Sequence, residues 1–347
     1  MKSKIGIICI GQAGGNIGVL MKNENFDVAF INSSKGDLDT LNVDTSKKHH
    51  ITDGLGCAKD RATAKQIAQK DFSNINEFLN KSLGEKEFYY IVFSTGGGTG
   101  SGISPVLADI LTTHLGKKVG LITILPSVKD TLQAHINAYE CVQEISNLKN
   151  ICSTFVIDNN RKYSMLQINE KFVKLFNKIF DYKKYETNKG NIDEAEIVKL
   201  LETKGMINIS TCKNDETTNK LIENIKNDIF APLENDSKIK YLGLSKGIKF
   251  DEELFSKEIG KYLDKFENSN KEYTLAILSG LTLPFKRVRE MKDKILSEKE
   301  TILSFEKEKE EKLDDIDFLV RKTSSNVDTN YKTQDKLNID DLFAQYL

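Results

Sequence analysis

Glycines and hydroxyl side chains alternate along residues 96–102, which read Gly-Gly-Gly-Thr-Gly-Ser-Gly. Glycine adopts backbone angles that other residues avoid, and it lets a ligand approach the main chain closely. The run follows an apolar segment, 89–93, typical of a buried strand, and precedes a helical pattern at 103–115. Consecutive amide N–H groups at a helix start bind anions, and Thr99 and Ser101 add hydroxyl donors. This stretch therefore predicts a cradle for phosphate groups.

A second glycine loop follows the first apolar segment of the chain. Residues 11–18 read Gly-Gln-Ala-Gly-Gly-Asn-Ile-Gly, after a strand expected at Ile5–Ile10. On its own this loop would indicate only a weak dinucleotide-type turn. The longer run is not a Walker A loop either, because Ile103 and Ser104 follow its last glycine where that loop has a lysine and a hydroxyl residue.

Together the two loops resemble the phosphate-binding loops of the tubulin/FtsZ superfamily of GTPases. Residues 96–102 are similar to the superfamily signature, and residues 11–18 to the first loop of tubulin. The resemblance implies GTP or GDP with Mg²⁺ as cofactors, with Gln12 facing the phosphates and their metal and Asn16 near the nucleoside. The nucleotide-binding residues that it implies in these loops are Gly11, Gln12, Ala13, Gly14, Gly15, Asn16, Gly96, Gly97, Gly98, Thr99, Gly100, Ser101 and Gly102.

Charged residues stand where the superfamily places its phosphate and ribose contacts. Lys59 and Arg61 replace small residues of the third nucleotide loop, where cations would neutralise phosphate charge. Charges in the first turn of the following helix are an equally good interpretation. Asp130, four residues after Pro126, matches the acidic residue that meets the ribose hydroxyls, although Ala134 replaces the arginine of the family.

Asparagines occupy the positions at which the resemblance implies further nucleotide contacts. Asn32 ends an apolar segment where the family has its second loop, and Asn159 matches the residue that hydrogen-bonds the guanine edge. A carboxamide suits a purine because it offers both a donor and an acceptor. The central helix should supply a second base contact, for which spacing to the next motif favours Asn188 over Asn177 and Asn191.

The catalytic loop of the superfamily comes from the neighbouring subunit and begins with a glycine and an asparagine. The segment that ends at Asn208 resembles this start, but the acids that the family places two and five residues later are replaced by Ser210 and Lys213. A lysine cannot orient water as a carboxylate does. Asp215 and Glu216 could take over, so Asn208, Asp215 and Glu216 are the expected catalytic residues.

The elements that must position these loops alternate along the first half of the chain. Strands are expected at 5–10, 27–32, 88–94, 118–125 and 151–157, and helices at 16–22, 59–81, 103–115 and 129–149. Such alternation predicts an α/β fold with a parallel sheet, which binds ligands at the carboxyl ends of its strands. The resemblance implies a tubulin/FtsZ-like nucleotide domain, a central helix, a smaller α+β activation domain, and a long C-terminal helix and tail.

Five segments are expected from this layout. They are a GTP-binding domain at 1–162, a linking region with the central helix at 163–205, an activation domain at 206–285, a C-terminal helix at 286–322 and a flexible tail at 323–347. The activation domain should hold a helix near 217–229 and strands at 241–250 and 273–283.

Composition narrows the function classes. The 347 residues carry 50 Lys and Arg against 51 Asp and Glu, so no net positive charge favours direct binding of nucleic acid. Five cysteines without a C-x-x-C pair, and four histidines without ligand spacing, argue against a protein-ligated metal and for a reducing compartment. No apolar run reaches the ~18 residues of a membrane span. We expect a cytoplasmic protein of a prokaryote or a phage-infected host.

Within the superfamily, the charged third loop and the long charged terminal helix resemble the TubZ group of plasmid- and phage-encoded proteins. This resemblance implies GTP-driven, head-to-tail filaments that segregate or position DNA through a DNA-bound adaptor. An FtsZ-like cell-division scaffold is the alternative, and a Rossmann-type oxidoreductase is a distant one that a titration with NADH against GTP would separate.

The last nine residues, 339–347, regain apolar character after a polar stretch. Ile339, Leu342, Phe343 and Tyr346 fall on one face of a short helix. Such a stripe needs a covering surface, and in the TubZ interpretation that surface belongs to the adaptor. Docking on the protein's own body or on the next subunit is the alternative.

Overall fold

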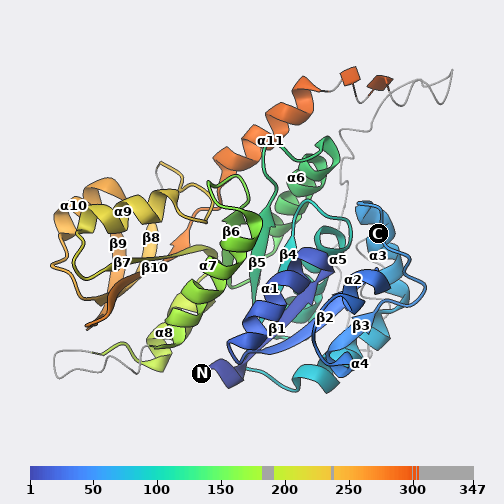
Figure 1. Cartoon of the computed structure of the whole chain (residues 1–347), viewed down its shortest axis with the longest axis horizontal. Helices are drawn as coiled ribbons and strands as arrows, with labels where there is room; N and C mark the ends of the chain where they lie inside the picture. Colours follow the sequence, from blue (N-terminus) through green and yellow to red (C-terminus); the bar gives the residue numbers. More distant parts are fainter. Residues whose placement is uncertain (182–190, 236–237, 299, 302, 305–347) are drawn as a thin grey trace, which may run out of the picture.

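A mostly parallel β-sheet runs through the whole molecule (Figure 1). The structure is a computed structural model that describes residues 1–181, 191–235, 238–298, 300–301 and 303–304. Within these residues the strand order is β3-β2-β1-β4-β5-β6-β7-β10-β8-β9. The strands are β1 (Ile5–Ile10), β2 (Asp27–Asn32), β3 (Lys48–His50), β4 (Phe88–Ser94), β5 (Val119–Leu125), β6 (Ser153–Asp158), β7 (Gly205–Lys213), β8 (Ile239–Lys246), β9 (Tyr262–Ser269) and β10 (Tyr273–Leu281).

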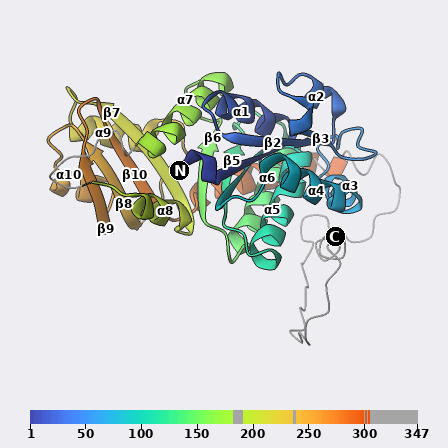
Figure 2. The same cartoon turned by 90° about the horizontal axis from the view of Figure 1, so that it is seen from below.

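Helices cover both faces of the sheet (Figure 2). They are α1 (Gly11–Asn23), α2 (Lys35–Asp39), α3 (Arg61–Lys70), α4 (Phe72–Leu83), α5 (Thr99–Asp109), α6 (Leu132–Asn147), α7 (Met165–Lys178), α8 (Glu194–Glu202), α9 (Thr218–Asn227), α10 (Glu252–Glu258) and α11 (Phe285–Ser297). A π-helical turn, Ile110–His114, extends α5. None of the described helices is long and apolar enough to span a bilayer.

All strands from β3 to β7 are parallel. Their residues are β-branched and aromatic and are buried on both faces, as expected when helices cover both sides of a sheet. One face packs on α1 and α7, and the other packs on α3, α4, α5 and α6. The expected α/β class with a nucleotide-type parallel sheet is therefore confirmed.

The second half of the chain continues the same sheet. β7 joins β6 through a short parallel ladder in which Ser153 to Phe155 pair with Gly205 to Ile207. Beyond it, β10 pairs antiparallel with β7 and with β8, and β9 closes the edge. Alternate residues of β10 face α8 on one side, through Leu275 and Ile277, and α9 and α10 on the other, through Ala276 and Leu278.

Several expected boundaries differ from the structure. The helix expected at 59–81 breaks at Asp71, because this buried carboxylate accepts hydrogen bonds from Thr52 (2.6 Å) and Asn74 (2.7 Å) and lies 2.6 Å from His49 Nε2. The edge strand β9 was not expected. In the C-terminal helix expected at 286–322, α11 ends at Ser297, and the tail lies outside the described residues.

Candidate functional site

The two glycine loops meet at the carboxyl edge of the sheet. β1 and β4 are parallel neighbours, with Cys9 opposite Val92, so the loops that follow them leave the sheet side by side. Gly11 has a φ of +73°, and a Cβ atom there would lie 3.3 Å from the backbone nitrogen of Gly100. The backbones of the two loops are therefore in contact. The first loop forms the first turns of α1. Gln12 and Asn16 are exposed on these turns.

The signature loop ends in an uncapped helix N-terminus. Gly98 is the N-cap of α5 and provides no side-chain hydrogen bond, so the first amide groups and the positive end of the helix dipole remain available to an anion. Thr99 Oγ1 lies 2.7 Å from Ser33 Oγ and thereby joins this loop to the second loop. The buried Ser101 hydroxyl instead donates within its own loop, to the carbonyl oxygens of Gly97 and Gly98.

The third loop, which contains Leu55 and Lys59, packs directly on the signature loop, residues 96–102. Ala58 and Lys59 have φ angles of 43° and 65°, in the left-handed region that non-glycine residues rarely adopt. A Cβ atom on Gly98 would lie 2.9 Å from the Cα of Lys59, so the contact requires a glycine. The Lys59 ammonium group donates to Thr131 Oγ1 (3.1 Å) and is exposed at the rim of the loops.

Arg61 does not supply a second cation to this rim. Its side chain is 7% exposed and forms ion pairs with Glu140 (2.9 Å) and Glu144 (2.5 Å). It also donates to the carbonyl oxygen of Ser101 at 3.0 Å. The interpretation of Arg61 as a phosphate-neutralising residue is therefore wrong, because its charge is buried and compensated within the fold. Arg61 instead links α3 to α5, through Ser101, and to α6, through Glu140 and Glu144.

The ends of β5 and β6 carry the expected ribose and base residues. Asn159 directly follows β6, and its buried Oδ1 atom has no partner among the described residues, which leaves an acceptor open to a ligand N–H group. Asp130 is exposed, and its Oδ2 atom accepts from the backbone nitrogen of Ser127 (2.8 Å). Ala134 is buried where the family has an arginine.

Asn32 has a different environment from Asn159. It is buried at the end of β2, where its Oδ1 atom accepts from the backbone nitrogen of Ser34 (3.2 Å) and its Nδ2 atom donates to Asp37 (3.3 Å). Both ends of the carboxamide are used within the second loop. Asn32 therefore shapes this loop.

The direction of α7 determines which asparagines of this helix lie near Asn159 and could contact the base. α7 starts shortly after the carboxyl end of β6 and leads to α8, whose Glu194 forms an ion pair with Lys4 (2.8 Å) at the amino end of β1. The first turns of α7 are therefore near Asn159, and its last turn is far from it. Asn177 lies in that last turn, and Asn188 lies outside the described residues. Asn169, in the second turn, is half-buried and is a candidate that the spacing to Asn208 does not select.

The assignment of Asn208 to an exposed catalytic loop is wrong. Asn208 is 1% exposed in the middle of β7, where its Nδ2 atom donates to the carbonyl oxygen of Ile225 (3.3 Å). Ser210 is buried in the same strand. The apolar and β-branched residues from 206 to 212 pair with β10, so this segment could not reach another subunit.

Asp215 and Glu216 form a turn after β7. Glu216 accepts a hydrogen bond from the backbone nitrogen of Lys213 (2.7 Å). Because β7 is parallel to β6, this turn leaves the sheet at the same edge as the glycine loops. A catalytic loop donated to the nucleotide of a stacked neighbour must lie at the opposite edge, so the geometry argues against both residues.

The acidic pattern that the resemblance requires occurs earlier in the chain. Asn191 is followed by Asp193 and Glu196, which are two and five positions later. Asp193 is the N-cap of α8, and the two carboxylates form a capping box with each other's backbone nitrogens at 2.8 and 3.0 Å. The neighbouring ion pair of Lys4 with Glu194 fixes this segment at the amino edge of the sheet. The spacing alone could have found it.

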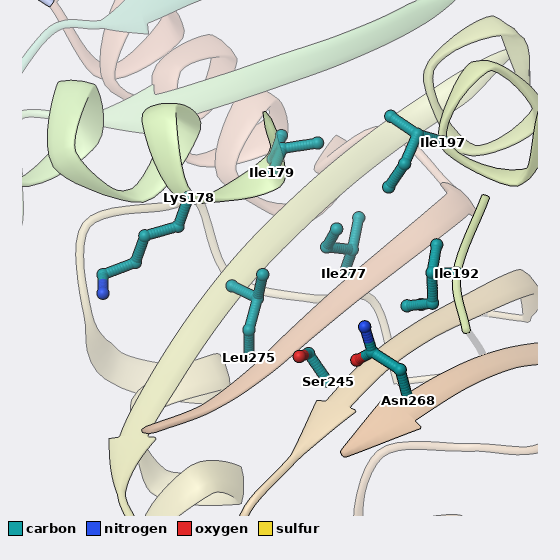
Figure 3. A pocket seen from close by; sticks show the side chains of 9 residues that line it. Lys178, Ile179, Ile192, Ile197, Ser245, Asn268, Leu275 and Ile277 are labelled. Carbon is teal, nitrogen blue, oxygen red and sulfur yellow. The ribbon is translucent and has the colours of Figure 1, made fainter. Parts of the chain in front are cut away.

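A small cavity lies away from these loops, between α7, α8 and the distal strands (Figure 3). Its volume of about 10 Å³ accommodates a single water molecule and excludes a nucleotide. The carboxamide of Asn268 points into it and has no partner among the described residues. Across those residues, moreover, no group of three His, Cys, Asp or Glu side chains is arranged to hold a metal ion.

The fold and the glycine loops at its carboxyl edge define a nucleotide-binding GTPase of the tubulin type. Residues 4–167 match the model of the Tubulin/FtsZ family, GTPase domain. This match identifies a tubulin/FtsZ-type GTPase domain in residues 4–167, and a domain of this type implies that the site binds GTP and GDP.

Individual relatives extend the similarity beyond this domain. The tubulin-like protein TubZ of Clostridium botulinum C phage is 29% identical over 306 residues, which cover 86% of this chain and 84% of TubZ. The crystal structure of TubZ from Clostridium botulinum phage c-st has a TM-score of 0.79 at 27% identity, covering 87% of this chain and 100% of that one. A GTPγS-form protofilament structure of Bacillus thuringiensis TubZ shares the fold, with a TM-score of 0.71 at 17% identity over 88% of this chain and 94% of that one.

Proposed function

We propose that this GTPase assembles head to tail into filaments, and that each subunit completes the hydrolytic site of the next. The observation that supports this most directly is the separation of the two halves of the site. The glycine loops lie at the carboxyl edge of the sheet, and the Asn191–Glu196 segment lies at the amino edge. Stacking copies in one orientation brings the acids of one subunit onto the nucleotide of its neighbour.

In this arrangement Asp193 and Glu196 orient the attacking water. The water oxygen forms a bond to the γ-phosphorus, the bond to the β–γ bridging oxygen breaks, and GDP and phosphate leave. The amides at the start of α5 stabilise the charge on the phosphate oxygens. Mg²⁺ would be held by the nucleotide and by the exposed Gln12, and it would neutralise charge on the phosphates. Mg²⁺ needs few protein ligands, which fits the absence of a carboxylate cluster among the described residues.

The surface around the nucleotide loops supports association with a second copy. Large apolar side chains are exposed at three places in this region: Leu55 on the third loop, Val128 after β5, and Met165 and Leu166 in the first turn of α7. Exposed apolar groups that gather around one site indicate an interaction surface. A stacked subunit would cover them.

On the base side, we assign the guanine contacts to Asn159 and Asn169. Asn159 offers an unpaired buried acceptor, and Asn169 lies on the turn of α7 that faces the same end of the sheet. The ribose contact of Asp130 and the phosphate role of Lys59 remain part of the proposal.

We further propose that the filaments segregate or position plasmid or phage DNA through a DNA-bound adaptor. The similarity to a phage TubZ over most of the chain supports this role. The adaptor-docking segment expected at 339–347 lies outside the described residues, and deleting it should abolish co-sedimentation with the adaptor while leaving GTP turnover intact.

Light scattering after addition of GTP and Mg²⁺, with phosphate release recorded in parallel, tests the assembly mechanism. We expect both signals to rise steeply above a critical protein concentration. Phosphate release that is strictly proportional to protein concentration would contradict a site shared between subunits.

A further inference from the structure

The side chain of Asn137 joins two of the nucleotide loops. It lies on α6, is 2% exposed, and donates from Nδ2 to the carbonyl oxygens of Lys59 (2.7 Å), Gly97 (3.2 Å) and Gly96 (3.4 Å). Its Oδ1 atom accepts from Gln133 Nε2 (2.9 Å). One buried carboxamide thus bridges the third loop and the signature loop.

These contacts fix the direction of the glycine amides. The peptide bonds are trans, so the N–H group of each unit points opposite to its carbonyl group. Because the carbonyl groups of Gly96 and Gly97 turn toward Asn137, the N–H groups of Gly97 and Gly98 turn away from α6. No acceptor for these two amides occurs among the residues that the structure describes. Successive amides that point into one concavity form an anion-binding nest.

Asn137 also holds a strained segment. Ala58 and Lys59 are both in the left-handed region, and the Lys59 carbonyl makes the shortest of the three hydrogen bonds to Asn137. Without this bond the two residues would relax toward ordinary angles. The Lys59 backbone would then move away from Gly98, on which it packs.

We propose that Asn137 is a positioning residue for phosphate binding: it aims the amides of Gly97 and Gly98 at the phosphates and holds Lys59 beside them. This inference rests on the proposed nucleotide site. Asn137 does not touch the nucleotide and acts through the carbonyl groups of the loops.

Two substitutions of similar size test this role. Asn137→Asp keeps the shape but cannot donate when ionised, and Asn137→Leu removes the donors without adding charge. We expect both to weaken binding of a fluorescent GTP analogue about tenfold or more, because buried carbonyl groups lose their partner. The loss should be larger for Asn137→Asp, whose charge repels phosphate. Gln133→Met, which disturbs only the Oδ1 side, is the matched control and should bind like the wild type.

Thermal unfolding without nucleotide separates positioning from folding. The variants should keep most of their unliganded stability and lose the stabilisation that GDP gives the wild type. If Asn137→Leu is folded and binds GTP as tightly as the wild type, the inference is wrong. If the wild type itself fails to bind, the proposed site is wrong instead.

A measurement on the unmodified chain covers the case in which the variants do not fold. The ¹⁵N–¹H resonances of Gly97 and Gly98 should shift when GDP is added. Unchanged resonances in a GDP-bound protein would overturn the inference.

Discussion

Arg287 on α11 forms a buried ion pair with Asp158 at the end of β6. The two side chains are 2% and 3% exposed, and Nε of Arg287 lies 3.2 Å from Oδ2 of Asp158. Nη2 also donates to the carbonyl oxygen of Pro126 (2.7 Å), at the end of β5. Arg287 therefore holds α11 against the carboxyl ends of β5 and β6, the two strands that precede Asp130 and Asn159.

Removing one member of this pair should strongly destabilise the fold. Arg287→Met leaves the Asp158 carboxylate buried without its partner, which costs about 3–5 kcal/mol of the free energy of unfolding. Urea unfolding of the purified variant measures this cost. Arg289→Met on the same helix is the control, since Arg289 is largely exposed and 4.0 Å from Glu234. Equal effects of the two substitutions would contradict a special role for the buried pair.

Asp193→Asn and Glu196→Gln should slow GTP turnover in the assembled state without weakening nucleotide binding. Asparagine still caps a helix, so α8 should persist in the first variant. A loss of about 100-fold in phosphate release is expected when a water-orienting carboxylate is removed. Filaments should form and persist for longer, which light scattering can follow.

Asp215→Ala is the matched control for these variants, because the turn after β7 lies at the other edge of the sheet. Its turnover should equal that of the wild type. If Asp215→Ala lost most of its GTP turnover while Asp193→Asn kept normal turnover, the segment after Asn208 would again be the better candidate for the catalytic loop.

The sequence predicted the parallel strands β1, β2, β4, β5 and β6 and the glycine loops, but it did not predict β3 or β7. β1 and β4 are apolar runs that lead into the glycine loops, and β2 is an apolar run that ends at Asn32, so their type and boundaries follow from the local pattern. The contact between Gly98 and Lys59 could not be inferred, because it depends on how two loops distant in sequence pack.

The catalytic motif shows how a local match misleads. Asn208 follows a glycine as the family pattern requires, but the residues around it are β-branched and pair with β10. Asn191 has both acids at the correct spacing. The spacing of the acids therefore favours Asn191, and the position of α8 at the amino edge of the sheet, beside Lys4, agrees with that choice.

Asn159→Ala and Asn169→Ala should each reduce affinity for GTP and GDP by a similar factor. Each loses hydrogen bonds to the base, which is shared by both nucleotides, and a loss of about five- to tenfold is expected for one neutral hydrogen bond. Titration with fluorescent GTP and GDP analogues measures this. Asn177→Ala, in the last turn of α7, is the control, and weaker binding in that variant alone would place the base contact elsewhere.

His135 should make the fold less stable in mild acid. Burial lowers the pKa of this histidine below its ordinary value of 6.5, and the charges of Lys294 and Arg287 lower it further, against the opposing effects of Asp130 and the Val128 carbonyl group. The folded state therefore binds fewer protons than the unfolded state, so stability is fully present above about pH 6.5 and is lost as the pH falls through the lower pKa of the folded state. Urea unfolding between pH 7.5 and pH 5.5 should show a steeper decline for the wild type than for His135→Leu. His114→Gln controls for the loss of any histidine, and parallel pH profiles for the wild type and His135→Leu would show that His135 does not contribute.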